Sequence, residues 1–357
     1  MIKVGINGGF GFIGYHLWLY LTYKCNDIDV IRLSKELTQS EISECDIIFH
    51  MAEQNSGDVN ELYKNNTNSA IKLTNKLNEY NVTPKIIYTS SIHQNIDNLY
   101  GKWRRDNIDM FLKKGVDLTV VQLPNIFGPF CKPNYNSFIA TFCDTIINGD
   151  SKLKVNDSKI NLLYVDNLCK QLYEVIKESR IELDVDTTTS VNQIHNLLLD
   201  FKEKYINNGE IPLLNDDFEI NLFNTFRSYI KDDNLKSNVK INVDSRGVLS
   251  ELMISRIKGQ IFYSTTNTNC TRGNHFHTKR IERFCVLSGT ALIQIRKIGT
   301  DKIIEYYISG DDYQVIDIPV CYTHNLKNVG NNTLVCCFWM NDILSEQNPD
   351  DTYYEIV

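Results

Sequence analysis

Three histidines and one glutamate in the last third of the chain are spaced as metal ligands. His275 and His277 are separated by one residue, and Glu282 follows five positions after His277. In a strand the side-chain period is two, so both imidazoles would lie on one face. His324 can join them from a distant hairpin. Three imidazoles and one carboxylate suit Zn²⁺, Fe²⁺, Mn²⁺ or Ni²⁺, so these residues predict a divalent metal site without choosing among those ions.

A glycine-rich turn near the N-terminus has the spacing of a phosphate-binding loop. An apolar run leads into Gly8, Gly11 and Gly14, in the pattern G-x-x-G-x-x-G. The first glycine would permit a tight turn, the second would admit a pyrophosphate, and the third would let a helix pack closely. The helix amides then hold the phosphates. We predict dinucleotide contacts from this turn, including Phe12 and Ile13; the alternative is a turn without a ligand.

The second predicted strand bears on which dinucleotide is bound. A strand that holds the ribose 2′-hydroxyl of NAD ends in an acid, whereas here residues 30–33 are followed by Ser34 and Lys35. Arg32, Ser34 and Lys35 could instead hold a 2′-phosphate, so the sequence favours NADPH. The alternative is that these three residues are solvated surface groups.

The elements that would position the glycine turn lie in the first part of the chain. Short apolar runs alternate there with helical patterns. Such alternation predicts an α/β fold, a Rossmann-type doubly wound parallel sheet with right-handed crossovers. The predicted strands are residues 2–6, 30–33, 46–51, 85–90 and 118–123, and the predicted helices are residues 15–23, 60–80, 101–114 and 191–207.

The elements that would position the histidines are of a different kind. After residue 239, short β-rich runs separated by turns predict an all-β barrel. The polar stretch 231–240 predicts the boundary between a first domain, residues 1–240, and a second, residues 241–357. The predicted strands of the second domain are residues 259–265, 283–287, 291–296, 303–308, 314–318 and 333–339.

Composition and charge exclude several classes of partner. The 357-residue chain is 42% hydrophobic and has a net charge of 37 − 44 = −7, so it lacks the basic footprint expected for nucleic acid. No apolar stretch approaches the roughly 20 residues that span a bilayer. No charged segment of a signal peptide precedes the first strand. Ten cysteines lie without a CxxC pair, which indicates reduced thiols and a cytoplasmic location.

The N-terminal pattern resembles the extended short-chain dehydrogenase/reductases. Beyond the glycine turn, the resemblance continues at H-M-A (50–52), at Y-T-S-S (88–91) and at L-P-N-I-F-G-P (123–129). It implies further cofactor contacts from Met51, Ala52 and Pro124 and a substrate contact from Asn125.

The same resemblance implies a reductase site. In that family a serine and a tyrosine hydrogen-bond the substrate carbonyl, the tyrosine delivers a proton, and a lysine four residues later holds the ribose. Chain position points to Ser91 and Tyr100, but Arg104 stands at the lysine position. Lys102 cannot replace it, because position i+2 points away from i on a helix. Arginine keeps the positive charge yet differs in shape and donors, so the alternative is a domain that binds nucleotide without reduction.

The histidine pattern is similar to the two cupin motifs. The stretches from His275 to Gly289 and from Pro319 to Asn328 match their ligands and flanks. Cys321 replaces the glycine of the second motif, and Asn269 stands where the leading glycine of the first would be. The resemblance implies an all-β cupin (jelly-roll) domain.

A second resemblance overlays the cupin motifs. The residues D-S-R-G-V-L-S-E (244–251) and R-G-N-H-F (272–276) look like the 3,5-epimerases of nucleoside-diphosphate 4-keto-6-deoxy sugars. In those enzymes the histidine of R-G-x-H is the base that removes a proton beside the ketone. His275 therefore has two candidate roles, base and metal ligand. The resemblance also implies substrate contacts from Arg246, Glu251 and Arg272.

The whole chain, including K-P-N-Y-N-S at 132–137, resembles the bifunctional 3-epimerase/4-keto-reductases of capsular-polysaccharide synthesis. That resemblance implies a UDP-linked deoxy amino sugar, a UDP-2-acetamido-2,6-dideoxy-4-keto-hexose, as substrate, NADPH, Zn²⁺ in the cupin and a homodimer. The two activities suit one substrate: a 4-ketone acidifies C3–H and can later accept a hydride. Two alternatives remain, a cupin epimerase with an inactive nucleotide-binding domain and a non-enzymatic NADP-responsive binding protein.

Overall fold

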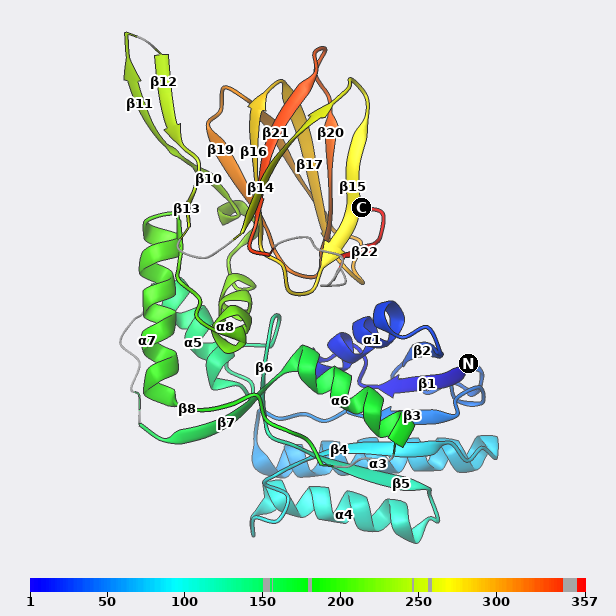
Figure 1. Ribbon diagram of the computed structural model, residues 1–357. Coiled ribbons are helices and arrows are strands. Elements are labelled where there is room, and N and C mark those ends of the chain that lie inside the picture. Colours follow the sequence, from blue (N-terminus) through cyan, green and yellow to red (C-terminus); the bar gives the residue numbers. More distant parts are fainter. Residues whose placement is uncertain (150–154, 156, 179–181, 246, 256–258, 343–351) are drawn as a thin grey trace. The chain divides into compact units, whose positions relative to one another are not determined.

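The structure, a computed structural model, describes residues 1–149, 155, 157–178, 182–245, 247–255, 259–342 and 352–357 (Figure 1). By Cα proximity the chain splits into two compact units. The first is Met1–Phe142 with Lys154–Ile194, and the second is Cys143–Leu153 with His195–Val357. The boundary after residue 240 stays a prediction.

The first unit is built on a parallel sheet with strand order β2-β1-β3-β4-β5. Its strands are β1 Ile2–Asn7, β2 Ile28–Leu33, β3 Ile47–His50, β4 Lys85–Ser91 and β5 Leu118–Leu123. The side chains of β3 are buried along its whole length, as expected for a parallel strand that helices cover on both faces. The strand order reverses at β1, which creates the switch point where α/β proteins bind ligands.

Helices cover both faces of this sheet in Figure 1, with α1 beside α6 on one face and α3 beside α4 on the other. The helices of the unit are α1 Phe12–Lys24, α2 Gln39–Ile42, α3 Val59–Tyr80, α4 Leu99–Lys113 and α6 Val165–Glu178, and a small second sheet joins β6 Asn125–Phe127, β7 Lys159–Tyr164 and β8 Thr187–Ser190. The predicted Rossmann-type fold is confirmed. The short sheet and α6 were not predicted from the sequence.

Two helices begin in the first unit and run into the second, α5 Phe138–Ile147 and α7 Val191–Phe201. The predicted helix 191–207 is regular only as far as Phe201, because its last part is a π-helix, η1 Lys202–Asn207. Also in the second unit are α8 Asp217–Arg227, the 3₁₀ turn η2 Asp232–Asn234, and the short pair β9 Glu210–Ile211 and β13 Ile254–Ser255.

Two five-stranded sheets form most of the second unit, in the orders β10-β19-β16-β21-β14 and β18-β17-β20-β15-β22. Every pairing within them is antiparallel. The strands are β10 Lys236–Asn238, β14 Gln260–Thr266, β15 Thr271–His277, β16 Glu282–Ser288, β17 Thr290–Lys297, β18 Ile303–Ser309, β19 Gln314–Ile318, β20 Tyr322–Asn328, β21 Leu334–Met340 and β22 Thr352–Tyr354. A separate hairpin pairs β11 Lys240–Asp244 with β12 Gly247–Glu251.

Apolar side chains from both sheets form one core, with Ile293, Ile316 and Leu334 fully buried. This all-β arrangement confirms the cupin-like second half of the predicted fold class. Among the described residues, no helix is both long and apolar enough to cross a membrane.

Candidate functional site

The glycine turn joins β1 to α1 in a conformation that only small residues allow. Gly8 has a φ of +96°, and a Cβ there would lie 2.7 Å from the main-chain carbon of Met51 and 2.8 Å from the nitrogen of Ala52. At Gly14, a Cβ would lie 2.3 Å from the oxygen of Gly8. Gly11 caps α1 and brings no side chain that could take the amides of the first turn. The helix N-terminus can therefore receive a phosphate.

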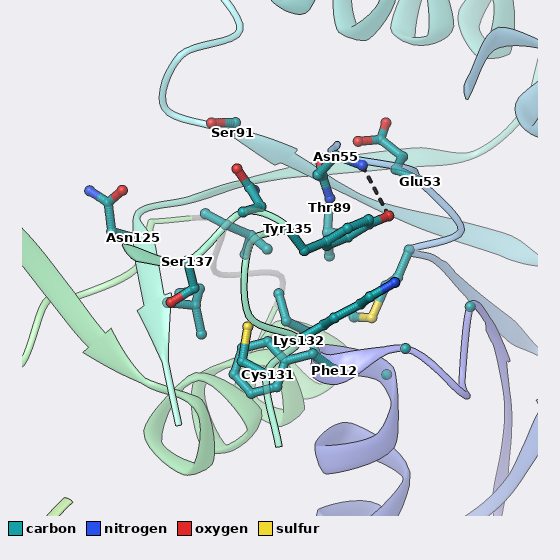
Figure 2. Close-up of a pocket in the computed structure, with 18 of the residues that line it drawn as sticks. Phe12, Glu53, Asn55, Thr89, Ser91, Asn125, Cys131, Lys132, Tyr135 and Ser137 are labelled. Carbon is teal, nitrogen blue, oxygen red and sulfur yellow. Dashed lines mark hydrogen bonds between the residues drawn. The ribbon is translucent and has the colours of Figure 1, made fainter. Parts of the chain in front are cut away.

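A cavity of about 1100 Å³ lies beside this turn in the first unit. It extends from the glycine turn to the ends of β4 and β6, and Figure 2 shows Phe12, Ser91 and Asn125 around it. Of the predicted cofactor, reductase and substrate residues, those that line the cavity are Gly8, Gly11, Phe12, Ile13, Gly14, Lys35, Met51, Ser91, Tyr100, Arg104, Pro124 and Asn125. Because the cavity brings the glycine turn together with Ser91 and Tyr100, it joins most of the predicted cofactor residues with the reductase residues. Arg32, Ser34 and Ala52 are not among the described residues that line it.

The segment 132–137 also lines the cavity, a role that the sequence reasoning did not assign. Lys132, Tyr135 and Ser137 contribute to the wall. The hydroxyl of Tyr135 accepts a hydrogen bond of 3.1 Å from the main-chain nitrogen of Asn55. This contact ties the segment to the chain that follows β3.

Two of the residues predicted to hold a 2′-phosphate, Arg32 and Ser34, differ from each other in their contacts. The Arg32 guanidinium carbon lies 4.5 Å from the ring centroid of Phe10 and 4.1 Å from that of Trp18. The side chain at the end of β2 is thus held between two aromatic rings. Ser34, in contrast, donates from its hydroxyl (2.8 Å) and its main-chain nitrogen (2.9 Å) to Glu41.

Glu41 is an acid beside the proposed 2′-phosphate region that was not predicted. Burial alone would raise its pKa, but hydrogen bonds from Ser34 and Thr38 hold the pKa below its usual value. It therefore stays ionised and keeps Ser34 occupied. The capping-box pattern Thr38-x-x-Glu41, which starts α2, is the sequence signal that could have revealed it.

The connection from β4 to α4 places Ser91 and Tyr100 on one cavity. Asn98 caps α4 by accepting a 2.8 Å hydrogen bond from the nitrogen of Gly101. A Cβ at Gly101 would lie 2.2 Å from a main-chain oxygen of the connecting loop. Arg105 donates to two main-chain oxygens of the same loop, at 2.6 and 3.0 Å. The loop is therefore packed tightly onto the first turn of the helix that carries Tyr100.

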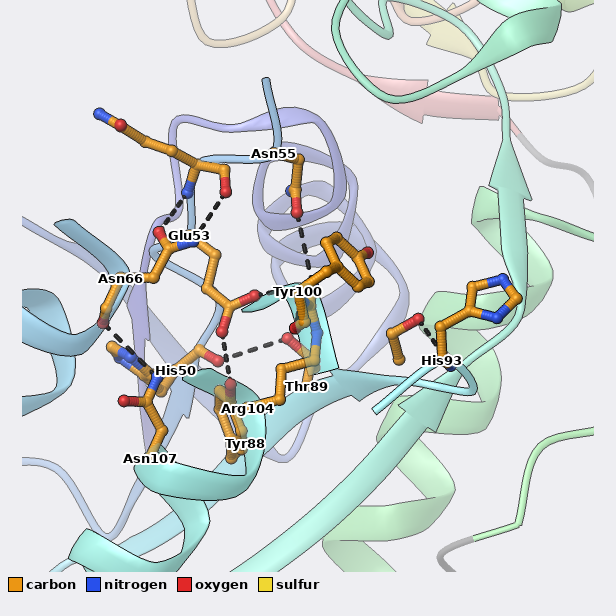
Figure 3. A network of polar contacts seen from close by, with 12 residues as sticks. His50, Glu53, Asn55, Asn66, Tyr88, Thr89, His93, Tyr100, Arg104 and Asn107 are labelled. Carbon is orange, nitrogen blue, oxygen red and sulfur yellow. Dashed lines mark hydrogen bonds and ion pairs between the residues drawn. The ribbon is translucent and has the colours of Figure 1, made fainter. Parts of the chain in front are cut away.

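Arg104, at the position of the family's lysine, lies buried against Tyr100. Its Nη1 donates to the main-chain oxygen of Tyr100 at 3.1 Å, and the guanidinium carbon is 3.9 Å from the centroid of that ring. Its Nη2 lies 3.1 Å from a carboxylate oxygen of Glu53 (Figure 3). Glu53 was not predicted as a site residue. The only feature of the sequence that could have drawn attention to it is that an acidic residue follows β3 by three positions.

The metal-type residues of the second unit lie close together. Ligand atoms of His275, His277 and Glu282 all lie within 4.8 Å of one another. The Nε2 of His324 is 3.2 Å, and that of His277 3.4 Å, from the same carboxylate oxygen of Glu282. The rings of His275 and His324 have centroids 4.5 Å apart. Strands β15, β16 and β20, drawn from both sheets, supply this cluster.

The donor set fits a divalent transition metal. The Nδ1 of His324 lies 3.3 Å from the main-chain oxygen of Tyr322, and that of His277 lies 3.3 Å from the Thr352 hydroxyl. Such outer contacts orient imidazoles so that the other nitrogen can bind a metal. Burial lowers the pKa of His324 to about 4. Burial would raise the pKa of Glu282, but the three imidazoles lower it to about 2. Histidine binds a metal as the neutral imidazole and glutamate as the ionised carboxylate, so both pKa shifts favour the forms that bind a metal.

Both departures from the cupin glycines occupy the conformation that glycine favours. Cys321 and Asn269 each have a φ of +62°, in the left-handed region. Asparagine tolerates this region better than other non-glycine residues do. The motif's backbone shape is therefore kept although its glycines are gone.

The predicted substrate residues of the second unit are described only in part. Arg272 donates from Nε to the Thr266 hydroxyl at 3.0 Å and from Nη2 to the oxygen of Thr265 at 2.8 Å. Arg246 lies outside the described residues, and for Glu251 the description covers only the backbone of β12. The structure thus places Arg272 alone of the three.

Comparisons with known proteins agree with both halves of the chain. The family model of the Polysaccharide biosynthesis C-terminal domain matches residues 242–353. A curated relative from Pseudomonas aeruginosa, UDP-2-acetamido-2,6-beta-L-arabino-hexul-4-ose reductase, is 28% identical over 98% of this chain and 97% of its own. The crystal structure of the capsular polysaccharide assembling protein CapF from Staphylococcus aureus is 30% identical over 100% of both chains, with a TM-score of 0.58. A structure of CapF with the inhibitor 3-isopropenyl-tropolone has the same identity and coverage, with a TM-score of 0.54. Full-length similarity at this identity, with both halves in the same order, shows that the protein belongs to the CapF family.

Proposed function

We propose that the protein is a bifunctional nucleotide-sugar enzyme. It epimerises C3 of a UDP-2-acetamido-2,6-dideoxy-4-keto-hexose in the cupin domain and then reduces the 4-keto group with NADPH in the Rossmann domain. The product is an L-configured N-acetyl amino-deoxy sugar. The observation that carries the proposal is the cavity in which the glycine turn meets Ser91 and Tyr100. The name of the P. aeruginosa relative, a reductase of a UDP-linked hexul-4-ose, supports the substrate class.

In the reductase site, each residue has a distinct task. The amides at the start of α1 hold the pyrophosphate, and Arg32 and Lys35 face the 2′-phosphate. The hydroxyls of Ser91 and Tyr100 donate hydrogen bonds to the C4 oxygen, which orients and polarises the ketone. NADPH, when bound, supplies the hydride that C4 accepts. Tyr100 gives its proton to the C4 oxygen as the alcohol forms.

In the epimerase site, the residues present would hold a divalent metal, for which we propose Zn²⁺. The ligands would be His275, His277, Glu282 and His324. Such an ion supplies Lewis-acid polarisation of a carbonyl oxygen. The 4-ketone acidifies C3–H, so transfer of that proton to a base of the site and protonation of C3 on the other face would invert C3. His275 retains two candidate roles, and its place among the other ligands favours metal binding over action as the base.

The order of the two steps follows from the chemistry. Reduction removes the ketone, and without the ketone C3–H is no longer acidic. Epimerisation must therefore come first. We extend the proposal to a homodimer, as the resemblance implies, and to a cytoplasmic location, which the cysteine usage favours.

One observation favours a second candidate, a cupin epimerase whose Rossmann domain only binds nucleotide. Arg104 is held in an ion pair with Glu53, whereas the family's lysine reaches the cofactor. In this alternative the arginine marks a degraded reductase site.

A single assay separates the two candidates. Metal-replete protein is incubated with the 4-keto sugar nucleotide in D₂O, with and without NADPH, while C3 deuterium and NADPH absorbance are followed. The bifunctional proposal expects deuterium uptake in both samples and loss of NADPH when it is present. Uptake without NADPH loss would establish the epimerase alone. Absence of both signals would refute both candidates.

A further inference from the structure

A buried ion pair lies directly behind the proposed proton donor. The side chains of Glu53 and Arg104 are 6% and 4% exposed, and 3.1 Å separates their charged atoms. The other carboxylate oxygen of Glu53 accepts a hydrogen bond from the Tyr88 hydroxyl. Figure 3 shows this network reaching from the chain after β3 to the first turns of α4. Burying two charges is costly, so the pair calls for a reason beyond stability.

The terminal nitrogens of Arg104 are engaged by neighbouring protein groups. Nη1 donates to the oxygen of Tyr100, and Nη2 is shared between Glu53 and Asn55, whose side-chain oxygen is 3.4 Å away. The third donor, Nε, is buried as well. Both terminal nitrogens of the guanidinium therefore already have protein partners, although Arg104 lines the cavity. The face of the guanidinium covers the ring of Tyr100.

We propose that Glu53 is a positioning residue of the reductase site, which holds Arg104 against Tyr100 so that the tyrosine hydroxyl stays aimed at the ketone. Glu53 and Arg104 together take the place of the single lysine of the reductase family. This inference rests on the proposed function. It differs from the degraded-site alternative because it makes Arg104 a working part of the reductase.

Two variants separate positioning from a structural role. E53Q keeps the shape of the side chain and removes its charge, which leaves Arg104 buried without a counter-ion. In the double variant E53Q/R104M both charges are absent, so the burial penalty disappears while the cation behind Tyr100 is also lost. The measurements are kcat for NADPH loss, the dissociation constant of NADPH, C3 deuterium uptake and the thermal midpoint.

The proposal expects E53Q to lower kcat by about tenfold or more, because small misplacements of a catalytic group have effects of this size. NADPH affinity should stay within about threefold, and C3 deuterium uptake should match the wild type. The double variant should recover the thermal midpoint but not kcat. It also carries the test if E53Q fails to fold, since its kcat should again be about tenfold or more below the wild type.

Three outcomes would overturn the proposal. Recovery of kcat together with the thermal midpoint in the double variant would make the pair structural. A wild-type kcat in E53Q would overturn the role of Glu53 while leaving the proposed function intact. No NADPH loss by the wild-type protein would overturn the proposed reduction and this inference with it.

Discussion

Both candidate sites contain residues that depart from the motifs they resemble, and the two units accommodate those departures differently. In the cupin-like barrel, Cys321 and Asn269 stand in place of glycines yet keep a φ of +62°. In the Rossmann-type unit, Arg104 stands in place of a lysine and acquires the ion partner Glu53. The first departure preserves a backbone shape, and the second replaces a side-chain contact.

The difference shows which part of each motif the site depends on. The barrel needs the turn before β20 to bring His324 to Glu282, and any residue that adopts the left-handed conformation can provide that turn. The proposed reductase site would use a cation near Tyr100; Arg104 lies there and is paired with Glu53 from a separate segment. A residue that differs from the motif can therefore be interpreted only when the contact made by the usual motif residue is known.

The largest effect that we predict concerns the barrel. Removal of the metal by a chelator, or H324A, should lower C3 deuterium uptake by roughly 100-fold or more, because a Lewis acid supplies several kcal/mol to such a step. NADPH binding, followed by fluorescence, should not change. K327A, an exposed position on the same strand, is the matched control. Equal loss of NADPH binding would contradict the separation of the two sites.

The next largest effect concerns Arg104, which stands where the reductase family has a lysine. R104K should lower kcat for NADPH loss by about tenfold, because a single ammonium cannot both pair with Glu53 and cover the ring of Tyr100. K102R on the exposed face of α4 serves as the control and should leave kcat unchanged. An increase in kcat on R104K would show that the natural arginine marks a degraded site.

The cofactor region offers a comparison between two neighbouring residues. R32A should weaken NADPH relative to NADH by roughly 10- to 100-fold, because it removes the cation that we propose binds the 2′-phosphate. S34A should change this ratio by less than about threefold, since its hydroxyl is already bound to Glu41. The ratio of kcat/KM for the two cofactors measures both. A larger effect from S34A would refute the assignment of the 2′-phosphate to Arg32.

The smallest effect concerns the barrel's preserved backbone. C321V should destabilise the protein by roughly 1–2 kcal/mol more than C321G, because a β-branched residue is strained at positive φ. The urea midpoint at fixed metal concentration measures the difference. Equal midpoints would mean that the left-handed conformation of Cys321 does not matter for stability.

The sequence predicted those features that depend on local patterns. The strand 314–318 coincides with β19 at both ends, and the glycine turn lies where its spacing placed it. The four metal-type residues also converge, since their motif encodes both spacing and strand period. Arg104 was identified as a departure, but its partner was not. Glu53 and Arg104 are distant in the sequence, and no local pattern predicts a contact between the chain after β3 and the face of α4.

The remaining differences have equally physical causes. The interruption of the helix 191–207 by a π-helix depends on a change of hydrogen-bond register that apolar periodicity does not encode. The carboxylate of Glu41 was predictable in principle from its capping box, yet its position beside Ser34 follows from the turn after β2.

If one chain carries two separate chemistries, the Y100F variant should lose only the reduction. The variant is incubated in D₂O with the UDP-linked 4-keto sugar and saturating NADPH. We expect C3 deuterium uptake at the wild-type rate with NADPH loss reduced by roughly 100-fold or more. Loss of both signals, in a variant that still folds and binds NADPH, would contradict the claim that epimerisation and reduction occur at different sites.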